Sequence, residues 1–354
     1  MEQDKKNLLE MIDRPAFWVR DGIIHFSNQI AKNRQIREGM GIDQFLLDNI
    51  EVYQSFQGGC LYLTLEVGIV RCGATVTRQT DGDLFLLDRD LDTAQLQTLA
   101  LAGQQLRLPL SNVMTMADTL LEMMEENTQS SEQAGQLNRG LHQLLRIVSN
   151  MADSDRYMDW DTHSLETTEL SNFLREVVQK ARHTLEPTGI TIVYEELPRA
   201  VFTLADRERL ERAIYNMISN AVKFSPPNGT VHINASIQGK QACISVEDEG
   251  SGIAPGVMGS LFHRYQREAS VEDSRFGLGL GMTLIRTAAA MHGGTVLIDQ
   301  PKGTRVTMTI ALRKSVPGGL RTPILRISDY LGGHDAALVE LSETLPIDAY
   351  KKNI

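Results

Sequence analysis

The fold of this chain is decided by one stretch, Asn216-Met217-Ile218-Ser219-Asn220-Ala221-Val222-Lys223-Phe224. At the 3.6-residue period of an α-helix, Asn216, Asn220 and Lys223 share one face, and the apolar residues between them face a core. Amide oxygens are ligands for Mg²⁺ and a lysine ammonium donates to phosphate, so this polar line suits a metal and phosphate site. It also suits an ordinary solvated helix face. The choice between the two depends on the segments downstream of this helix.

Two glycine-rich segments come after this helix. The first, Asp248-Glu249-Gly250-Ser251-Gly252, comes directly after an apolar run that indicates a strand. A carboxylate at a strand end beside glycines can accept a hydrogen bond from a base amine while the backbone approaches the ring closely. The second, over 277–281, leads into the helical pattern of 282–291, and free N–H groups at a helix start form an anion site. Each segment alone is a common turn pattern, but the ordered set of three indicates a nucleotide pocket.

These motifs together resemble the ATP-binding domain of bacterial sensor histidine kinases, in the GHKL family that also contains gyrase-type and chaperone ATPases. Residues 216–224 are similar to the N box of that family, 248–252 to its G1 box and 277–281 to its G2 box. Further similarities, to the F box and to the closing glycine elements, lie in Phe262-His263-Arg264-Tyr265, His292-Gly293-Gly294 and Lys302-Gly303-Thr304. The resemblance implies an α/β sandwich in which ATP lies between the Asn helix and a lid at 266–275.

The resemblance also implies roles for individual residues. Asn220 is expected to ligate Mg²⁺ with support from Asn216, Lys223 to touch phosphate, and Asp248 to receive the adenine amine. ATP and Mg²⁺ are therefore the expected cofactors. The other residues expected to shape the nucleotide pocket are Gly250, Gly252, Phe262, Gly277, Gly279 and Gly281.

Length and composition are those of an ordinary globular protein with several domains. The chain has 354 residues, and 35 Lys plus Arg against 45 Asp plus Glu give a net charge of −10, which argues against nucleic-acid binding through a basic surface. Cys60, Cys72 and Cys243 have neither metal-ligand nor disulfide spacing, which fits a reducing cytoplasm. No apolar run is long enough to span a membrane. We therefore expect a cytoplasmic protein without membrane insertion.

Residues 1–90 alternate short strands with a helical or irregular interlude over 28–47. A hairpin turn is expected at Arg20-Asp21-Gly22. Three further alternating strands are expected at 61–67, 68–77 and 83–87. This order resembles a PAS-type sensory domain, and a generic α+β dimerisation domain is the alternative.

Residues 91–160 carry apolar stripes on two successive helices. Steps of three and four residues relate the members of the first stripe, which are Leu96, Leu99, Gly103, Leu106, Leu110, Val113, Ala117, Leu120 and Met124. The second stripe consists of Leu137, Leu141, Leu144, Val148 and Met151. Two such helices cannot bury their stripes alone, so we expect a homodimer in which two hairpins form a four-helix bundle.

The first helix departs from the family where phosphate would be accepted. Its run 106–110, Leu-Arg-Leu-Pro-Leu, resembles the end of the H box, which comes after a phosphoacceptor histidine and an acid in that family. Gln104 stands at the histidine position and Gln105 at the acid position, and Leu108 replaces the polar residue of the phosphatase reaction. A glutamine amide nitrogen is delocalised into its carbonyl and is no nucleophile, and Gln105 cannot act as a base. Self-phosphorylation at the usual site is therefore expected to be absent.

Several local features are expected outside these motifs. Ser171 is expected to cap a helix that comes after a strand at 165–170, and Asp206 to cap the Asn helix. A short helical stretch is expected over 335–341. His142, on the second stripe helix, is expected to have a partly exposed structural role and not to act as a substitute phosphoacceptor.

The sequence thus predicts a multidomain α+β protein. Its expected parts are a PAS-like sensory domain over 1–90, a dimerisation hairpin over 91–160, an ATP-binding domain over 161–314 and a C-terminal extension over 315–354. The expected function is that of a degenerate histidine kinase, a nucleotide-dependent switch in two-component signalling. Its expected partners are a second copy of the chain and a response regulator or a partner histidine kinase. Two alternatives stay open, an active kinase acting on a partner or on a non-standard histidine, and a scaffold with a vestigial ATP site.

Overall fold

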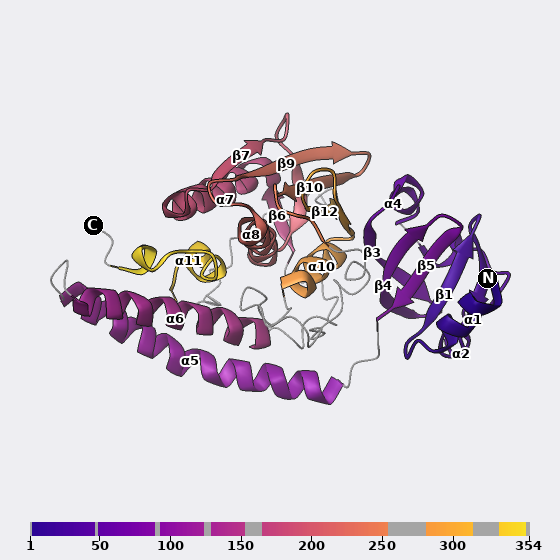
Figure 1. The fold of residues 1–354 in the computed structure, drawn as a ribbon, viewed down its shortest axis with the longest axis horizontal. Coiled ribbons are helices and arrows are strands. Elements are labelled where there is room, and N and C mark those ends of the chain that lie inside the picture. Colours follow the sequence, from indigo (N-terminus) through magenta and orange to yellow (C-terminus); the bar gives the residue numbers. More distant parts are fainter. Residues whose placement is uncertain are drawn as a thin grey trace.

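The computed structural model describes residues 2–46, 49–88, 93–123, 129–152, 165–253, 281–313 and 333–351. Figure 1 shows an N-terminal sheet with short helices around it, two long helices along one side of the molecule, and a layered α/β unit above those long helices. A yellow C-terminal segment lies between the long helices and the α/β unit. In the described ranges no helix is both long and apolar enough to cross a membrane.

The N-terminal unit is a five-stranded antiparallel sheet in the order β2-β1-β5-β4-β3. Its turn at Asp21 and Gly22 has positive φ at both residues, 51° and 76°, as a tight two-residue hairpin requires. Stacked rings of Phe17 and Phe85, with centroids 4.8 Å apart, mark its core. The predicted strands are confirmed; the PAS-type assignment stays a prediction. The elements are α1 (Glu2–Glu10), β1 (Ala16–Arg20), β2 (Ile23–Ser27), α2 (Gln29–Asn33), α3 (Asp43–Leu46), α4 (Ile50–Ser55), β3 (Cys60–Val67), β4 (Val70–Gln79) and β5 (Gly82–Leu87).

The long helices α5 (Thr93–Met123) and α6 (Gln129–Ala152) pack side by side and run antiparallel. A Cβ built on Gly103, near the start of α5, would lie 2.4 Å from the backbone N of Ala152 at the end of α6. Glycine is required there because the two backbones meet.

The structure divides each predicted stripe in two. Ala117 and Leu141 are buried between α5 and α6, together with Met114 and Leu145 from outside the predicted stripes. Val148 of the second stripe is buried as well, whereas five stripe members are at least half exposed, at 50–60% of their surface: Leu106, Val113, Leu120, Leu137 and Leu144. One hairpin therefore buries only part of its apolar surface.

The α/β unit is a mixed sheet covered on one face by three helices. Its strands follow the order β11-β12-β10-β9-β7, in which β7 and β9 are parallel and the other pairs antiparallel. Helices α7, α8 and α10 bury one continuous apolar core against this sheet. The elements are β6 (Glu166–Glu169), α7 (Leu170–Leu185), β7 (Thr191–Glu195), β8 (Phe202–Ala205), α8 (Arg207–Phe224), β9 (Thr230–Gln238), β10 (Gln241–Glu247), α10 (Gly281–Met291), β11 (Val296–Asp299) and β12 (Arg305–Ala311).

The expected cap of α7 was wrong by two residues. The carboxylate of Glu169 accepts from the backbone N–H groups of Ser171 and Asn172, at 3.1 and 2.9 Å, and so caps the helix. The Ser171 hydroxyl cannot serve as the cap because it donates to the carbonyl of Arg199, at 2.8 Å. A carboxylate at this end also suits the helix dipole.

The two sheets are joined into one. Strand β3 of the N-terminal unit pairs antiparallel with β11 of the α/β unit, with Leu61 opposite Leu297. Beside this junction Arg286 of α10 lies 3.1 Å from the Asp88 carboxylate, which also accepts from the Tyr62 hydroxyl at 2.8 Å. Backbone pairing and a largely buried ion pair therefore fix the N-terminal unit against the α/β unit.

The C-terminal segment 333–351 packs between α6 and α8. It contains α11 (Ala336–Glu340), which confirms the helical stretch expected over 335–341 and is capped by Asp335, and the 3₁₀ helix η5 (Ile347–Tyr350). Leu341 and Leu345 join the core of the α/β unit, whereas Val339 packs against the α5 and α6 pair. The segment covers His142, which is 4% exposed and lies against the Tyr350 ring. The expectation that His142 is partly exposed was therefore wrong.

Candidate nucleotide-binding site

The site is built on α8, which begins where the sequence predicts. Asp206 caps it by accepting from the backbone N–H of Arg209 at 3.1 Å. The backbone N–H of Asp206 donates in turn to Nε2 of His292, at 2.9 Å. The apolar face of α8 is buried in the core, and its polar line faces the start of α10 and the C-terminal segment.

The three residues of the polar line differ in exposure. Asn216 is fully buried, Asn220 is half-buried, and the side chain of Lys223 is 11% exposed. A Cβ on Gly281, the first residue of α10, would lie 3.1 Å from Oδ1 of Asn216 and 3.9 Å from Nδ2 of Asn220. The end of the second glycine segment therefore lies directly against the two asparagines, far from them in sequence.

The first glycine segment forms a tight loop around Asp248. Oδ1 of Asp248 accepts from the backbone N–H groups of Gly250 and Thr304, at 2.8 and 3.0 Å. Burial raises the pKa of this carboxyl above its usual value, and those N–H groups oppose the rise. A Cβ on Gly250 would lie 2.4 Å from the carbonyl oxygen of Phe224, so the loop lies against the end of α8. Gly252 has φ of 75°, a conformation that favours glycine.

The structure thus brings together most of the candidate residues in its described part. Asn216, Asn220 and Gly281 meet at the start of α10, and Asp248 and its loop lie at the end of α8. Phe262, Gly277 and Gly279, and the lid segment 266–275, lie outside the described residues. In the ranges that the structure covers, no cluster of three or more His, Cys, Asp or Glu side chains could hold a metal ion. A Mg²⁺ ion here would depend on amide and phosphate oxygens, which fits Asn220.

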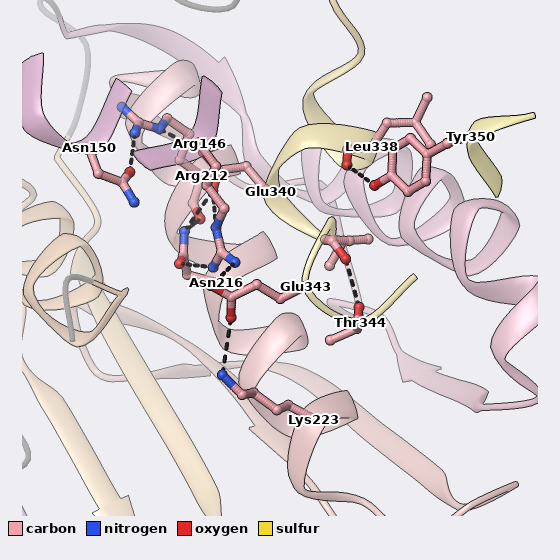
Figure 2. Close-up of polar contacts among 11 residues, drawn as sticks. Arg146, Asn150, Arg212, Asn216, Lys223, Leu338, Glu340, Glu343, Thr344 and Tyr350 are labelled. Carbon is pink, nitrogen blue, oxygen red and sulfur yellow. Dashed lines mark hydrogen bonds and ion pairs between the residues drawn. The ribbon is translucent and has the colours of Figure 1, made fainter. Parts of the chain in front are cut away.

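Two carboxylates that sequence reasoning missed complete the surroundings of the polar line. Glu340, from α11, is fully buried; its Oε1 accepts from Nε of Arg212 at 3.0 Å and its Oε2 from Nδ2 of Asn216 at 3.2 Å. Glu343 lies 3.1 Å from Nζ of Lys223. Figure 2 shows these side chains converging on α8 from the C-terminal segment.

An arginine of α6 joins the same network. Nη2 of Arg146 donates to Oδ1 of Asn216 at 2.9 Å, and the guanidinium lies 3.4 Å from Glu340 and 3.2 Å from Glu343. Burial opposes ionisation of Glu343, but the charges of Arg146 and Lys223 prevail and hold the pKa of this carboxyl below its usual value. The hairpin, the C-terminal segment and α8 are therefore linked through one polar cluster.

Gln104 and Gln105 lie on α5 with exposed side chains. Their exposure agrees with a surface position, but nothing in the described structure tests their alignment with a phosphoacceptor and an acid. Pro109 lies inside the same helix, whose described residues continue without a break past it.

A pH dependence of stability follows from the buried histidine behind α8. The ring of His292 accepts from Asp206 through Nε2, and its Nδ1 lies 2.6 Å from the Ala288 carbonyl, so the neutral ring is needed. Burial lowers the pKa of His292, and also that of His142. The unfolded chain therefore binds more protons below about pH 6.5, and stability is expected to fall there by up to about 1.4 kcal/mol per pH unit for each such group.

Urea unfolding at pH 7.5 and 5.5 measures this loss. His292→Gln keeps a side-chain acceptor and is expected to reduce the difference between the two pH values. His183→Gln is the matched control, because the His183 side chain is 90% exposed. An equal pH dependence in the wild type and in His292→Gln would contradict the assignment.

Comparisons with known proteins find similarity to one family of ATPases and to sensor kinases. Residues 205–314 match the family described as histidine kinase-, DNA gyrase B-, and HSP90-like ATPase. The sensor protein KdpD of Escherichia coli (strain K12) is 29% identical over 208 residues, 58% of this chain and 23% of KdpD. The histidine protein kinase DivJ of Caulobacter vibrioides is 28% identical over 258 residues, 70% of this chain and 42% of DivJ.

A solved structure is similar as well. The crystal structure of full-length ShkA in complex with AMPPNP matches with a TM-score of 0.50 and 26% identity, over 64% of this chain and 48% of the ShkA chain. The matched region spans less than half of the length of each of these three relatives.

Proposed function

From the premise that residues 205–314 form a histidine-kinase-type ATPase domain in a chain related to bacterial sensor histidine kinases, we propose that the protein is a nucleotide-dependent signalling switch. It binds Mg-ATP beside α8 and does not phosphorylate itself at the position that is usual in the family. The observation that carries the proposal is the meeting of Asn216, Asn220 and Gly281, with the Asp248 loop at the end of the same helix. This arrangement supports nucleotide binding, and Gln104 at the proposed acceptor position supports the absence of self-phosphorylation.

Each nucleotide group has a matching part of the site. Oδ1 of Asp248 accepts from the backbone N–H groups of Gly250 and Thr304, and this carboxylate is the acceptor that we assign to the adenine amine. Asn220 supplies an amide oxygen for Mg²⁺, and Lys223 a point donor for phosphate. The ShkA structure was obtained with AMPPNP, an observation that supports nucleotide binding in a similar fold.

The chemistry of α5 supports a degenerate kinase. Phosphoryl transfer to the protein needs an imidazole lone pair and a neighbouring carboxylate, and Gln104 and Gln105 supply neither. Bound Mg²⁺ would neutralise phosphate charge, but it does not replace a missing nucleophile. The protein therefore signals through the conformations that nucleotide binding selects.

Dimerisation through α5 and α6 is part of the proposal. Leu106, Val113 and Leu120 are spaced by seven residues and exposed, as are Leu137 and Leu144 on α6. A second hairpin placed against this surface would complete a four-helix bundle. A response regulator or a partner histidine kinase is the proposed downstream partner, and a PAS-type sensory role is proposed for 1–90.

A second candidate function is a kinase that phosphorylates a histidine of another chain. The meeting of Asn216, Asn220 and Gly281 favours it, because catalysis of phosphoryl transfer depends on the positioning of nucleotide, and the acceptor can come from elsewhere. Labelled ATP together with candidate partner kinases distinguishes this function from a switch without transfer.

The test of the proposed function measures ATP binding and self-labelling on the same purified protein. We expect saturable Mg-ATP binding, lost or strongly weakened in Asn220→Ala, with no acid-labile, base-stable label on the wild type. The mass of the sample in solution reports whether it is a dimer. A wild-type protein that labels itself would show that an acceptor other than Gln104 is active, and would refute the interpretation as a degenerate kinase.

A further inference from the structure

The C-terminal segment contacts the face of α8 that the proposed function assigns to metal and phosphate. Glu340 bonds to Asn216, and Glu343 to Lys223. Two of the three residues of the polar line are thus already paired with carboxylates. Both carboxylates come from one short segment, 340–343, at and just after the end of α11.

Both carboxylate oxygens of Glu340 already have donors, so Glu340 is not a spare metal ligand. Each of its oxygens has a donor, Nε of Arg212 for Oε1 and Nδ2 of Asn216 for Oε2, and the side chain is fully buried. The Arg146 guanidinium lies 3.4 Å from Oε2 as well. A buried carboxylate surrounded by two guanidinium groups and an amide is a stable ionic contact, because its charge is compensated and its oxygens are bonded.

Glu343 pairs with Lys223, the residue that the proposed function assigns to phosphate. The Lys223 ammonium is a compact donor at the end of α8, and a carboxylate at 3.1 Å satisfies the same charge that a phosphate oxygen would. Asn216 also has no free amide group, since its Nδ2 donates to Arg212 and Glu340 and its Oδ1 accepts from Arg146. A triphosphate that approached this face would meet two carboxylates of its own charge.

We propose that segment 333–351 is an internal competitor of nucleotide, in which Glu340 and Glu343 hold the polar face of α8 until Mg-ATP displaces them. The inference rests on the proposed function, because it assumes that this face takes Mg-ATP. It assigns the regulation of that site to the chain itself.

Displacement would also change how the domains are joined. Arg146 of α6 contacts Asn216, Glu340 and Glu343. The hairpin is therefore attached to α8 both directly and through segment 333–351. Val339 and Leu341 of the same segment pack against the hairpin and the α/β core respectively. Nucleotide that removes the two carboxylates therefore loosens the contact between hairpin and ATPase domain, which is the output of the switch.

The first test compares Mg-ATP dissociation constants of the full-length wild type and of Glu343→Gln. Glutamine keeps the size and hydrogen-bonding oxygen of Glu343 but removes its charge, and this side chain is 33% exposed, so folding is preserved. We expect the variant to bind Mg-ATP about tenfold more tightly, as the loss of one charge-assisted contact predicts. Glu340→Gln is expected to shift binding in the same direction.

Asp348→Asn is the matched control, because it removes one negative charge from the same segment at a side chain that is 74% exposed and pairs with Lys351. It is expected to bind Mg-ATP like the wild type. Equal affinities of the wild type, Glu343→Gln and Glu340→Gln for Mg-ATP would refute the proposal that segment 333–351 competes with nucleotide. The proposed function would be unaffected. If none of these proteins bound Mg-ATP, both the proposed nucleotide site and the proposed competition by segment 333–351 would be refuted.

Hydrogen exchange gives a second readout on the unaltered chain. The amide of Leu341 donates to the carbonyl of Ala337 at 2.9 Å, and that of Val339 to the carbonyl of Asp335 at 3.1 Å. Saturating Mg-ATP is expected to speed exchange at these amides by about tenfold or more, because the segment leaves its contacts with α6 and α8. Nucleotide binding with unchanged exchange at Val339 and Leu341 would overturn the proposal.

Discussion

Asp248→Ala is expected to weaken Mg-ATP binding by about 100-fold, close to 2.7 kcal/mol. The substitution removes the acceptor that we propose for the adenine amine, a side chain that is buried at 4% exposure. It also leaves the backbone N–H groups of Gly250 and Thr304 without their common acceptor, which loosens the loop. Titration of a fluorescent ATP analogue, or calorimetry, measures the change.

Two further variants distinguish loss of the contact to adenine from distortion of the loop around Asp248. Asp248→Asn keeps an oxygen for the two backbone N–H groups but can present an amide donor to the adenine amine, so weaker binding is expected here too. Glu249→Gln alters the neighbouring exposed carboxylate, which accepts from Thr230, and is expected to leave the affinity for Mg-ATP unchanged. An Asp248→Ala protein with wild-type affinity would place the adenine elsewhere.

The combined substitution Gln104→His and Gln105→Glu is expected to create self-labelling by ATP, whereas the wild type is expected to show none. Both side chains are exposed on α5, so the imidazole and the carboxylate can be introduced without disturbing a core. The imidazole supplies the nucleophile and the glutamate its base, and general base assistance alone is typically worth about 10²–10⁴ in rate. We expect an acid-labile, base-stable label at least about 100-fold above the wild-type background.

Gln105→Glu alone is the matched control for this gain. It introduces the acid without the nucleophile and is expected to stay unlabelled. A combined variant that binds Mg-ATP and also stays unlabelled would show that more than the acceptor has been lost. The proposed alignment of Gln104 with the acceptor position would then need revision.

The features of the site and of the fold that the sequence predicted correctly are those that depend on short-range sequence patterns. A helical period placed Asn216, Asn220 and Lys223 on one face, and the Asp206 cap fixed where that helix begins. Alternation and turn residues predicted the strands of the N-terminal sheet, with Gly22 in the positive-φ conformation that its turn requires. Both kinds of feature depend on residues close together in the chain.

The rest could not be predicted because it depends on pairs far apart in sequence. Nothing local to Glu340 distinguishes a carboxylate buried against Arg146 and Arg212 from one on a solvated helix face. The apolar stripe of α5 predicts that side chains seek partners, but not which half meets α6 and which half stays exposed. The cap of α7 was misplaced because Ser171 is engaged by Arg199, almost thirty residues later.

The pairing of Leu61 with Leu297 has a consequence for how the protein avoids association through its strand edges. Each of the two sheets would end there in a row of unpaired N–H and C=O groups, the feature through which β-proteins aggregate. Because β3 and β11 pair with each other, neither strand has a free edge there that could pair with another protein chain. A motion that separated the halves would open both edges at once, and its free-energy cost would include every main-chain bond lost between 60–62 and 296–298.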